Sequence, residues 1–410
     1  MNRIILVGNG FDLAHGLKTS YASFINWYWD EWGHRLIKSN SNYEKDEFYE
    51  FILKDDSGYG SWYYYATTGW GQNGSPRGVL SSAKTDNSIC TMKSHSKLFS
   101  NICEFLTGKN WVDIENEYYK QLTTTPIDAK KTNDDLDIIK NKLIQYLSTI
   151  ENDISGEIIN SNILKHMLEP LKKDDISLYG REHWIYMIQG RLRYSEDNVY
   201  DLVSSYYTKP HVIHYNCKAI NDFIKKHSNI NAKDINNNEI PDLFLLPNQT
   251  LVLNFNYTST ADIYLPKNDR VMINHIHGCL AKPDRIIFGY GDELDENYKT
   301  IVNKNDNEYL RNVKSIKYLE TPNYRWLLEF IELEPYQIYI MGHSCGNSDR
   351  TLLNTLFEHK NCVSIKPFYY IKENGSDSYL ELVQNISRNF TDMKLMRDKV
   401  VNKTFCETLS

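Results

Sequence analysis

The sequence lacks the long apolar runs and the paired cysteines that would mark a membrane protein or a small zinc module. No run of 18 apolar residues occurs, so a membrane span is not expected. The seven cysteines are scattered and form no CxxC pair, which argues against a structural four-cysteine zinc site. The first residues lack the charged and then apolar build of a secretory signal. We therefore expect reduced thiols and a cytoplasmic location.

An excess of basic residues is also missing. The 46 Lys and Arg are outnumbered by 53 Asp and Glu, which leaves a formal net charge of −7 over 410 residues. A general electrostatic attraction to nucleic-acid phosphates is therefore not expected, although a local basic patch stays open.

What the sequence does contain is a series of short apolar runs, each ended by Gly, Asn or His. Helical patterns such as SDRTLLNTLFEH separate several of them, and this alternation predicts an α/β fold with a mostly parallel sheet flanked by helices. The predicted strands lie within IILV at 4–7, QTLVLNFNY at 249–257, RVMINHIHG at 270–278, RIIFGYG at 285–291, YQIYIMGHS at 336–344 and IKPFYYI at 365–371.

The stretch between the first and second strands has a different texture. Residues 19–245 are polar and mainly helical in pattern, as in the amphipathic segment 132–150, where Thr132 and Asp135 resemble a capping pair. We expect a Rossmann-like core formed by residues 1–18 and 246–410, interrupted by this large insertion. The insertion includes a glycine- and aromatic-rich loop at 58–78. That loop could be a lid that stacks Trp62, Tyr64 or Trp70 on a base, an exposed loop or an oligomer contact.

Ligands of parallel sheets bind beyond the carboxyl ends of the strands, so the residues there are the first candidates. Gly8-Asn9-Gly10-Phe11-Asp12 follows the first strand, and its glycines would let backbone N–H groups approach a phosphate. Gly16 comes too late for the dinucleotide fingerprint GxGxxG. A tight strand-to-helix turn explains the same glycines equally well.

Amide side chains follow the second strand. Asn254 and Asn256 would share a face by strand alternation, and Tyr257 and Thr258 come next. An amide offers a donor and an acceptor, which suits ribose hydroxyls or an ordered water. For one of the two Asn residues, capping a helix that begins near Thr258 is the favoured alternative.

Histidines follow two further strands. His275 and His277 alternate before Gly278, and without a carboxylate or Cys nearby in the sequence we expect a general base rather than a metal pair; a core histidine bonded to backbone is the remaining alternative. Gly342, His343 and Ser344 end a later strand, where small residues permit the close approach of a sugar. For Asp349, a role at the helix N-terminus is favoured over catalysis.

Three segments together resemble the AbiH-type phage abortive-infection proteins: GNGFDLAHGLKTSYASF at 8–24, WVDIE at 111–115 and MGHSCGNSD at 341–349. The order of the strand-end motifs also resembles, more distantly, sirtuin-like NAD-binding domains.

The resemblance implies an anti-phage effector that binds NAD or a related nucleotide and hydrolyses its nicotinamide–ribose bond, with no metal. Carried over to this sequence, Gly8 and Gly10 with their neighbours Asn9, Phe11 and Asp12 would hold the pyrophosphate. Asn256, beside Tyr257, would orient the ribose or water, and His277 would be the base. Gly342, His343, Ser344 and Asp349 would line the adenosine side.

Two departures from the sirtuin pattern weaken the analogy: Thr258 stands where an acid is usual, and the four-Cys module is missing. Protein deacetylation is therefore not expected. Asp12 or Glu115 could stabilise positive charge in the transition state. For Glu115, an exposed carboxylate on its helix is the favoured alternative.

Two other functions stay open. One is a nucleotide-sensing or interaction module without turnover, and the other is an RNA-acting toxin. A phage-derived trigger, a partner defence protein and self-assembly would be compatible with each. We expect neither nucleic acid nor a membrane as a partner.

Overall fold

The structure is a computed structural model, and it describes residues 1–39, 43–53, 90–105, 113–124, 127–155, 158–192, 217–227, 231, 240–265 and 268–410. Contacts along the chain divide it into two compact units. The first comprises Met1–Gly16, Ile154–Ile286 and Tyr318–Ser410, and the second comprises Leu17–Asp153 and Ile287–Lys317. The domain division expected at residues 18 and 245 stays a prediction. The loop at 58–78, with Trp62, Tyr64 and Trp70, lies outside the described residues.

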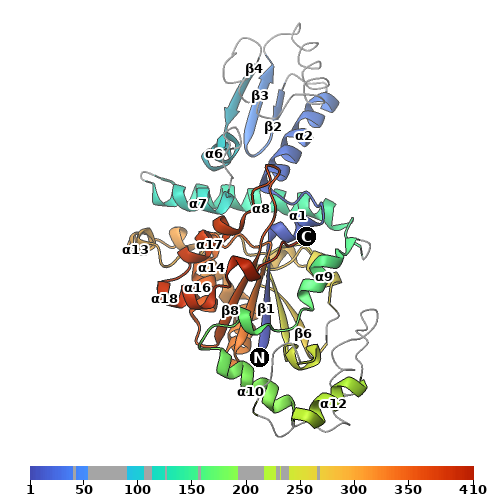
Figure 1. Ribbon diagram of the computed structural model, residues 1–410. Coiled ribbons are helices and arrows are strands. Elements are labelled where there is room, and N and C mark those ends of the chain that lie inside the picture. The colour runs from blue at the N-terminus through green and yellow to red at the C-terminus, as the bar shows by residue number, and fades with distance from the viewer. Residues whose placement is uncertain are drawn as a thin grey trace. The chain divides into compact units, whose positions relative to one another are not determined.

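A five-stranded, all-parallel sheet forms the centre of the first unit, in the order β6-β5-β1-β7-β8. Figure 1 shows β1 in the middle of this sheet. Ile4 of β1 lies opposite Leu251 of β5 on one side and Ile338 of β7 on the other. The strands are β1 Asn2–Val7, β5 Thr250–Asn254, β6 Val271–His275, β7 Tyr336–Met341 and β8 Cys362–Phe368.

Every residue of β1, β5, β7 and β8 is buried, as expected for strands covered on both faces, and this explains the unbroken apolar runs at residues 4–7 in β1 and 338–341 in β7. Helices α16, α17 and α18 contact β8, and α15 contacts β6. The helices of this unit are α1 Asn9–Ala14, α9 Ser161–Met167, α10 Arg181–Arg191, α12 Cys217–His227, α15 Asn323–Leu333, α16 Arg350–Glu358, α17 Tyr379–Arg388 and α18 Met393–Lys399. Short 3-10 turns are η3 Lys173–Asp175, η6 Asp242–Leu245, η7 Thr260–Ile263, η8 Pro283–Arg285, η10 Tyr318–Glu320, η11 Asn347–Asp349 and η12 Lys403–Phe405.

One predicted strand is wrong. Residues 285–291 form the end of η8 and an irregular segment with a bend at Gly289, in which Tyr290 makes an isolated bridge to Val313. The apolar residues Ile286–Phe288 are nevertheless buried. Their hydrophobicity therefore reflects burial of a loop, and a short apolar run alone does not distinguish that from a strand.

The second unit combines helices with a small antiparallel sheet in the order β2-β3-β4. Aromatic side chains form much of its core, and the rings of Phe48 and Phe99 stack with centroids 4.0 Å apart. Its elements are α2 Tyr21–Ser39, β2 Tyr43–Lys45, β3 Tyr49–Leu53, β4 Cys90–Ser94, α6 Lys97–Phe105, α7 Ile114–Thr123, α8 Ala129–Glu151, α13 Glu296–Val302, η9 Asn307–Leu310 and α14 Lys314–Lys317.

The predicted amphipathic helix is confirmed as α8, but its predicted capping pair is wrong. The helix begins a turn earlier, where the Asp128 carboxylate accepts the N–H of Lys131. Thr132 donates its hydroxyl to the Asp128 carbonyl, and Asp135 accepts a hydrogen bond from Ser96. None of the helices in the described ranges is long and apolar enough to cross a membrane.

Candidate functional site

Four of the candidate motifs meet at one edge of the parallel sheet. Strands β6, β5, β1 and β7 are parallel neighbours, so the residues after each lie at the same edge. The chain order reverses between β1 and β7, since β5 and β6 extend the sheet to one side and β8 extends it to the other. Such a reversal is where doubly wound sheets bind their ligands.

Glycines allow the loops after β1 and β7 to touch at this reversal. The N–H of Gly10 donates to the carbonyl oxygen of Gly342 at 2.8 Å, and the N–H of Gly8 donates to that of Met341 at 3.3 Å. A Cβ atom on Gly8 would lie 2.6 Å from the Cα of His343, and one on Gly10 would lie 2.8 Å from the Gly342 oxygen. Close packing thus explains both glycines, while their role towards a phosphate stays a prediction.

Asp349 lies between two imidazoles. Its Oδ1 is 3.2 Å from Nε2 of His277, and its Oδ2 is 3.5 Å from Nε2 of His343. The hydroxyl of Tyr318 is 3.1 Å from the same His277 nitrogen. All four side chains are buried. The site therefore combines a carboxylate, two imidazoles and a phenol that come from three segments of the chain.

Asp349 lies at a helix N-terminus, as the sequence predicted. The residue occupies the N-cap position of α16, but its side chain makes no capping hydrogen bond within the described structure. Its carboxylate faces the two histidines instead. The sequence alone could not distinguish a role at the helix N-terminus from a role in the site, because an acidic residue at the start of a helix suits both.

The environment of His343 determines its neutral tautomer. Nδ1 accepts the N–H of Cys345 at 3.0 Å, so the proton of the neutral ring lies on Nε2, facing Asp349. The Phe255 ring packs against both imidazoles, with its centroid 4.1 Å from that of His343 and 5.2 Å from that of His277. Neither Phe255 nor Tyr318 was predicted as a site residue: Phe255 lies within the motif after the second strand, where only the polar side chains were considered, and Tyr318 belongs to no motif.

Asn256 is held against the glycine turn after β1. Its Nδ2 donates to the carbonyl oxygen of Gly8 at 3.0 Å, and its N–H donates to Oδ1 of Asn254. Asn254 in turn donates to the carbonyl of Thr258. The favoured capping alternative for these amides is therefore wrong: both brace the turn after β5, and the helix expected near Thr258 is the single 3-10 turn η7.

Thr258 holds the buried acid of the first motif. Its hydroxyl donates to Oδ2 of Asp12 at 2.7 Å, and both side chains are almost fully buried. Phe11 is fully buried in the core beside Tyr264. The carbonyl oxygen of half-exposed Tyr257 accepts the N–H of Leu280.

The other candidate residues, Asn9, Ser344 and His275, differ in their exposure and in their partners. Asn9 is half-exposed at the start of α1, and Ser344 is exposed and accepts Nδ2 of Asn385 at its carbonyl oxygen. His275 pairs through Nε2 with Oδ1 of Asp262 at 3.0 Å. His275 and His277 thus pair with different carboxylates.

Glu115, in the second unit, is not the exposed carboxylate that was favoured. It is buried, with Oε2 2.8 Å from Nζ of Lys314 and Oε1 accepting the N–H of Gly289 at 3.3 Å. Burying a carboxylate is tolerated when a cation and hydrogen bonds satisfy it, and Lys314 lies far away in the sequence. Its neighbour Asp113 caps α7 through the N–H groups of Glu115 and Asn116.

The family model described as bacteriophage abortive infection AbiH matches residues 4–371. No curated protein and no solved structure matches significantly. The matched range includes the glycine turn, the WVDIE segment and both histidines beside Asp349. The chain therefore belongs to the bacteriophage abortive infection AbiH family.

Proposed function

We propose that this abortive-infection protein binds NAD or a closely related dinucleotide at the carboxyl edge of its parallel sheet and hydrolyses the bond between nicotinamide and ribose. The observation that carries the proposal is the pairing of His277 with Asp349 at that edge, at 3.2 Å. A histidine oriented by a buried carboxylate is a standard arrangement for a general base. The likeness to sirtuin-like domains supports the choice of substrate through the order of the motifs.

The chemistry needs few groups. Nicotinamide leaves as a neutral molecule, so its departure requires no protonation, and a water oxygen forms the new bond to C1′ of the ribose. His277 takes a proton from that water. When Nε2–H donates to Asp349, Nδ1 is the nitrogen that receives the proton, and the carboxylate stabilises the imidazolium that results.

Asn256 is suited to position the ribose or the water. Its amide nitrogen already donates a hydrogen bond to the Gly8 carbonyl, which fixes the plane of the side chain. The amide oxygen is then the group that can accept a hydrogen bond from a hydroxyl of the ribose or from water. Gly342 and Ser344 would lie towards the adenosine. The acid Asp12, tied to Thr258, would supply negative charge near the oxocarbenium-like transition state.

The test measures NAD, nicotinamide and ADP-ribose by mass spectrometry in cells that express the protein, with and without phage. The variants are His277→Ala and Asn256→Ala, and His34→Ala is a matched control because His34 is exposed on α2. We expect NAD loss in the wild type and the control, and none in the two site variants. Unchanged NAD in wild-type cells that resist phage or die on infection would refute the proposal.

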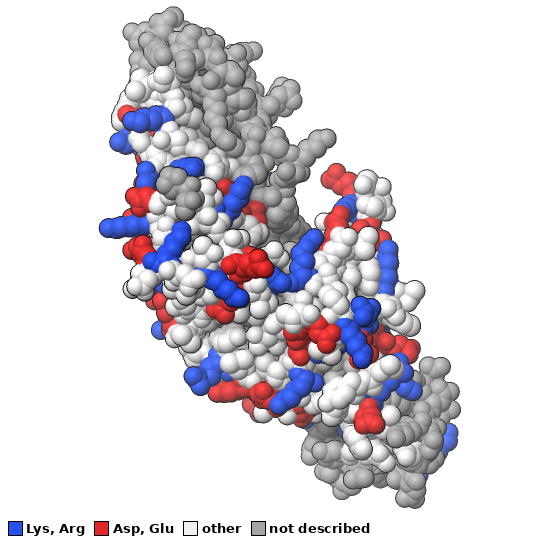
Figure 2. All heavy atoms as spheres, turned by 90° about the vertical axis from the view of Figure 1, so that its left-hand side faces the viewer, with Lys and Arg blue, Asp and Glu red and all other residues white. Residues whose placement is uncertain are grey.

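A non-catalytic nucleotide sensor is the second candidate. It is favoured by Thr258, which occupies the position of the expected acid and is engaged with Asp12. In that case, NAD incubated with the purified protein stays bound and intact, and His277→Ala weakens binding without changing any turnover. An RNA-acting toxin has less support: on the face shown in Figure 2, basic and acidic side chains are interspersed. Degradation of RNA by the pure protein, lost in His277→Ala, would favour that function.

A further inference from the structure

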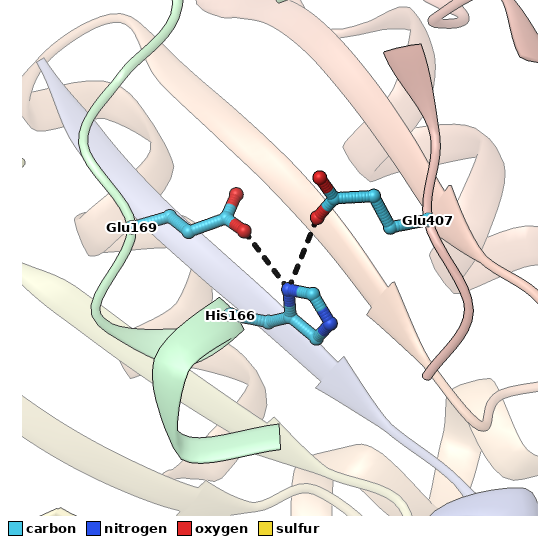
Figure 3. Close-up of side chains that lie close together, drawn as sticks. All are labelled: His166, Glu169 and Glu407. Atoms are coloured by element: carbon cyan, nitrogen blue, oxygen red, sulfur yellow. Dashed lines mark hydrogen bonds and ion pairs between the residues drawn. The ribbon is translucent and has the colours of Figure 1, made fainter. Parts of the chain in front are cut away.

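A second group of chemically active side chains lies within the first unit, apart from the His277–Asp349 pair. His166 and Glu169 come from the end of α9 and the residues after it, and Glu407 comes from the segment that follows η12 (Figure 3). Nδ1 of His166 is 2.9 Å from Oε1 of Glu169 and 3.3 Å from Oε2 of Glu407. One ligand atom from each of the three residues lies within 4.8 Å of the others.

The separations of 2.9 Å and 3.3 Å from Nδ1 are close to those between atoms that share a metal ion. Ligands bound at about 2.0–2.2 Å in a tetrahedral or octahedral arrangement lie roughly 3–3.5 Å apart. His166 and Glu169 are buried, whereas the side chain of Glu407 is 48% exposed. The buried pair would therefore be the fixed part of the site, and Glu407 has the freedom to close onto an ion.

In each of the two glutamates, one carboxylate oxygen faces His166 and the other faces Lys172. Oε2 of Glu169 is 3.2 Å from Nζ of Lys172, and Oε1 of Glu407 is 4.0 Å from the same nitrogen. The Lys172 ammonium group thus holds one oxygen of each carboxylate, while the other oxygen of each lies close to Nδ1 of His166. Groups that hold the outer atoms of ligands in this way are common around protein metal sites.

Two lysines lie near the site, and neither has to occupy the position of a metal ion. Lys366 is buried, but it pairs with Asp175 at 3.1 Å and lies 3.8 Å from Glu169. The side chain of Lys172 is 45% exposed, so it can turn into solvent. A divalent ion could then neutralise the two glutamates, with a neutral imidazole as the third ligand.

We propose that His166, Glu169 and Glu407 form a binding site for a divalent transition-metal ion, with Zn²⁺ as the preferred occupant. Imidazole nitrogen favours Zn²⁺ over Mg²⁺ or Ca²⁺, which prefer oxygen ligands. Three protein ligands leave a fourth position for water.

The role of the ion is to fasten the segment around Glu407 to the body of the sheet. That segment already pairs with the end of β8, where the N–H of Tyr369 donates to the Glu407 carbonyl and the N–H of Leu409 donates to that of Tyr369. On the other side, Arg3 of β1 donates to the carbonyl oxygens of Glu169 and Met167. A bound ion would thus join α9, the central strand and the residues beyond η12.

The test uses the full-length protein without a polyhistidine tag. Equilibrium dialysis against ZnCl₂, followed by elemental analysis, measures the bound ion, and the melting temperature is measured with and without Zn²⁺. We expect one Zn²⁺ per chain and a higher melting temperature with the ion. MnCl₂ and MgCl₂ serve as comparison ions, with Mg²⁺ expected to bind weakly.

Glu407→Gln is the decisive variant, because this half-exposed residue can be changed without disturbing the core. We expect its affinity for Zn²⁺ to fall by more than about tenfold and the thermal shift to disappear. His166→Ala should lose the ion as well, and circular dichroism checks its fold. His34→Ala, which removes an exposed histidine of α2, should bind like the wild type. No Zn²⁺ on the wild type, or equal binding in Glu407→Gln, would overturn the proposal.

Discussion

Nε2 of His277 lies 3.2 Å from Oδ1 of Asp349, although β6 and β7, which precede these residues, are separated in the sheet by β5 and β1. The loops after the outer strand and the inner strand therefore converge above the carboxyl edge. A buried carboxylate in this position orients the imidazole. This pair is the centre of the proposed hydrolytic site.

Asp349→Asn tests the pair without changing its shape. The amide keeps the volume but removes the charge that stabilises an imidazolium, so NAD turnover should fall by a factor on the order of 10²–10⁴. The measurement is the initial rate of nicotinamide release. Asp262→Asn is the matched control, because Asp262 pairs with His275 at the same edge. The opposite result, with Asp262→Asn inactive and Asp349→Asn active, would make His275 the base.

Gly342→Ala should destabilise the first unit. Gly342 has φ +79°, and a Cβ atom there would lie 2.0 Å from the backbone nitrogen of Phe11. Strain and collision together should lower the free energy of unfolding by more than about 2 kcal/mol, measured by urea denaturation.

The matched control for that substitution is Gly190→Ala in α10. A Cβ atom on Gly190 would meet no atom within 4 Å, and alanine favours helix over glycine by about 0.5–1 kcal/mol. Gly190→Ala should therefore be neutral or slightly stabilising. Equal stability of the two variants would mean that the loops after β1 and β7 do not pack as described.

Lys314→Met should weaken the second unit, because it leaves the Glu115 carboxylate buried without its cation. Breaking such a pair costs about 3–5 kcal/mol, and the double variant with Glu115→Gln should recover part of that loss. Urea denaturation of both variants gives the coupling. The control is Lys120→Met, since the side chain of Lys120 is 67% exposed and its pair with Glu117 should contribute at most about 1 kcal/mol.

Glu169 should make stability depend on acid pH. Burial alone would raise the pKa of its carboxyl, but the hydrogen bond to His166 and the charges of Lys172 and Lys366 lower that pKa to about 2 from 4.5. A pKa lowered by folding stabilises the native state above pH 4.5, and this contribution is lost as the pH falls towards 2.

Unfolding free energies between pH 2 and pH 6 measure this contribution. Glu169→Gln should flatten the acid limb of the curve by at most about 3 kcal/mol, while Glu373→Gln, at an exposed position, should leave it unchanged. An acid limb that stays equally steep in Glu169→Gln would assign the effect to other carboxyls.

The sheet could be predicted because its strands are buried on both faces, which leaves unbroken runs such as those around Ile5 and Ile338. The positions of Gly8, Asn256 and His277 at one edge followed from parallel pairing alone. The partners of His277 did not follow, because Asp349 and Tyr318 are far from it in the sequence and no short-range periodicity encodes their contacts.

The errors have a common physical cause. Residues 285–291 and Glu115 were interpreted from local pattern, as a strand and as a surface acid. Their environments depend on distant segments, since Gly289 packs against the Asn312 carbonyl and Glu115 pairs with Lys314. A local sequence pattern shows how apolar a segment is, whereas tertiary contacts determine its secondary structure and its burial.

The central place of β1 has a consequence for biosynthesis. The ribosome makes residues 2–7 before the other strands of the sheet, yet their neighbours β5 and β7 begin at Thr250 and Tyr336. During translation this apolar strand therefore stays unpaired until most of the polypeptide has been synthesised. Closing contacts of such long sequence separation is slow, and exposed apolar strands promote aggregation. Nascent chains of this protein should consequently depend on chaperones that shield the first strand until β7 is made.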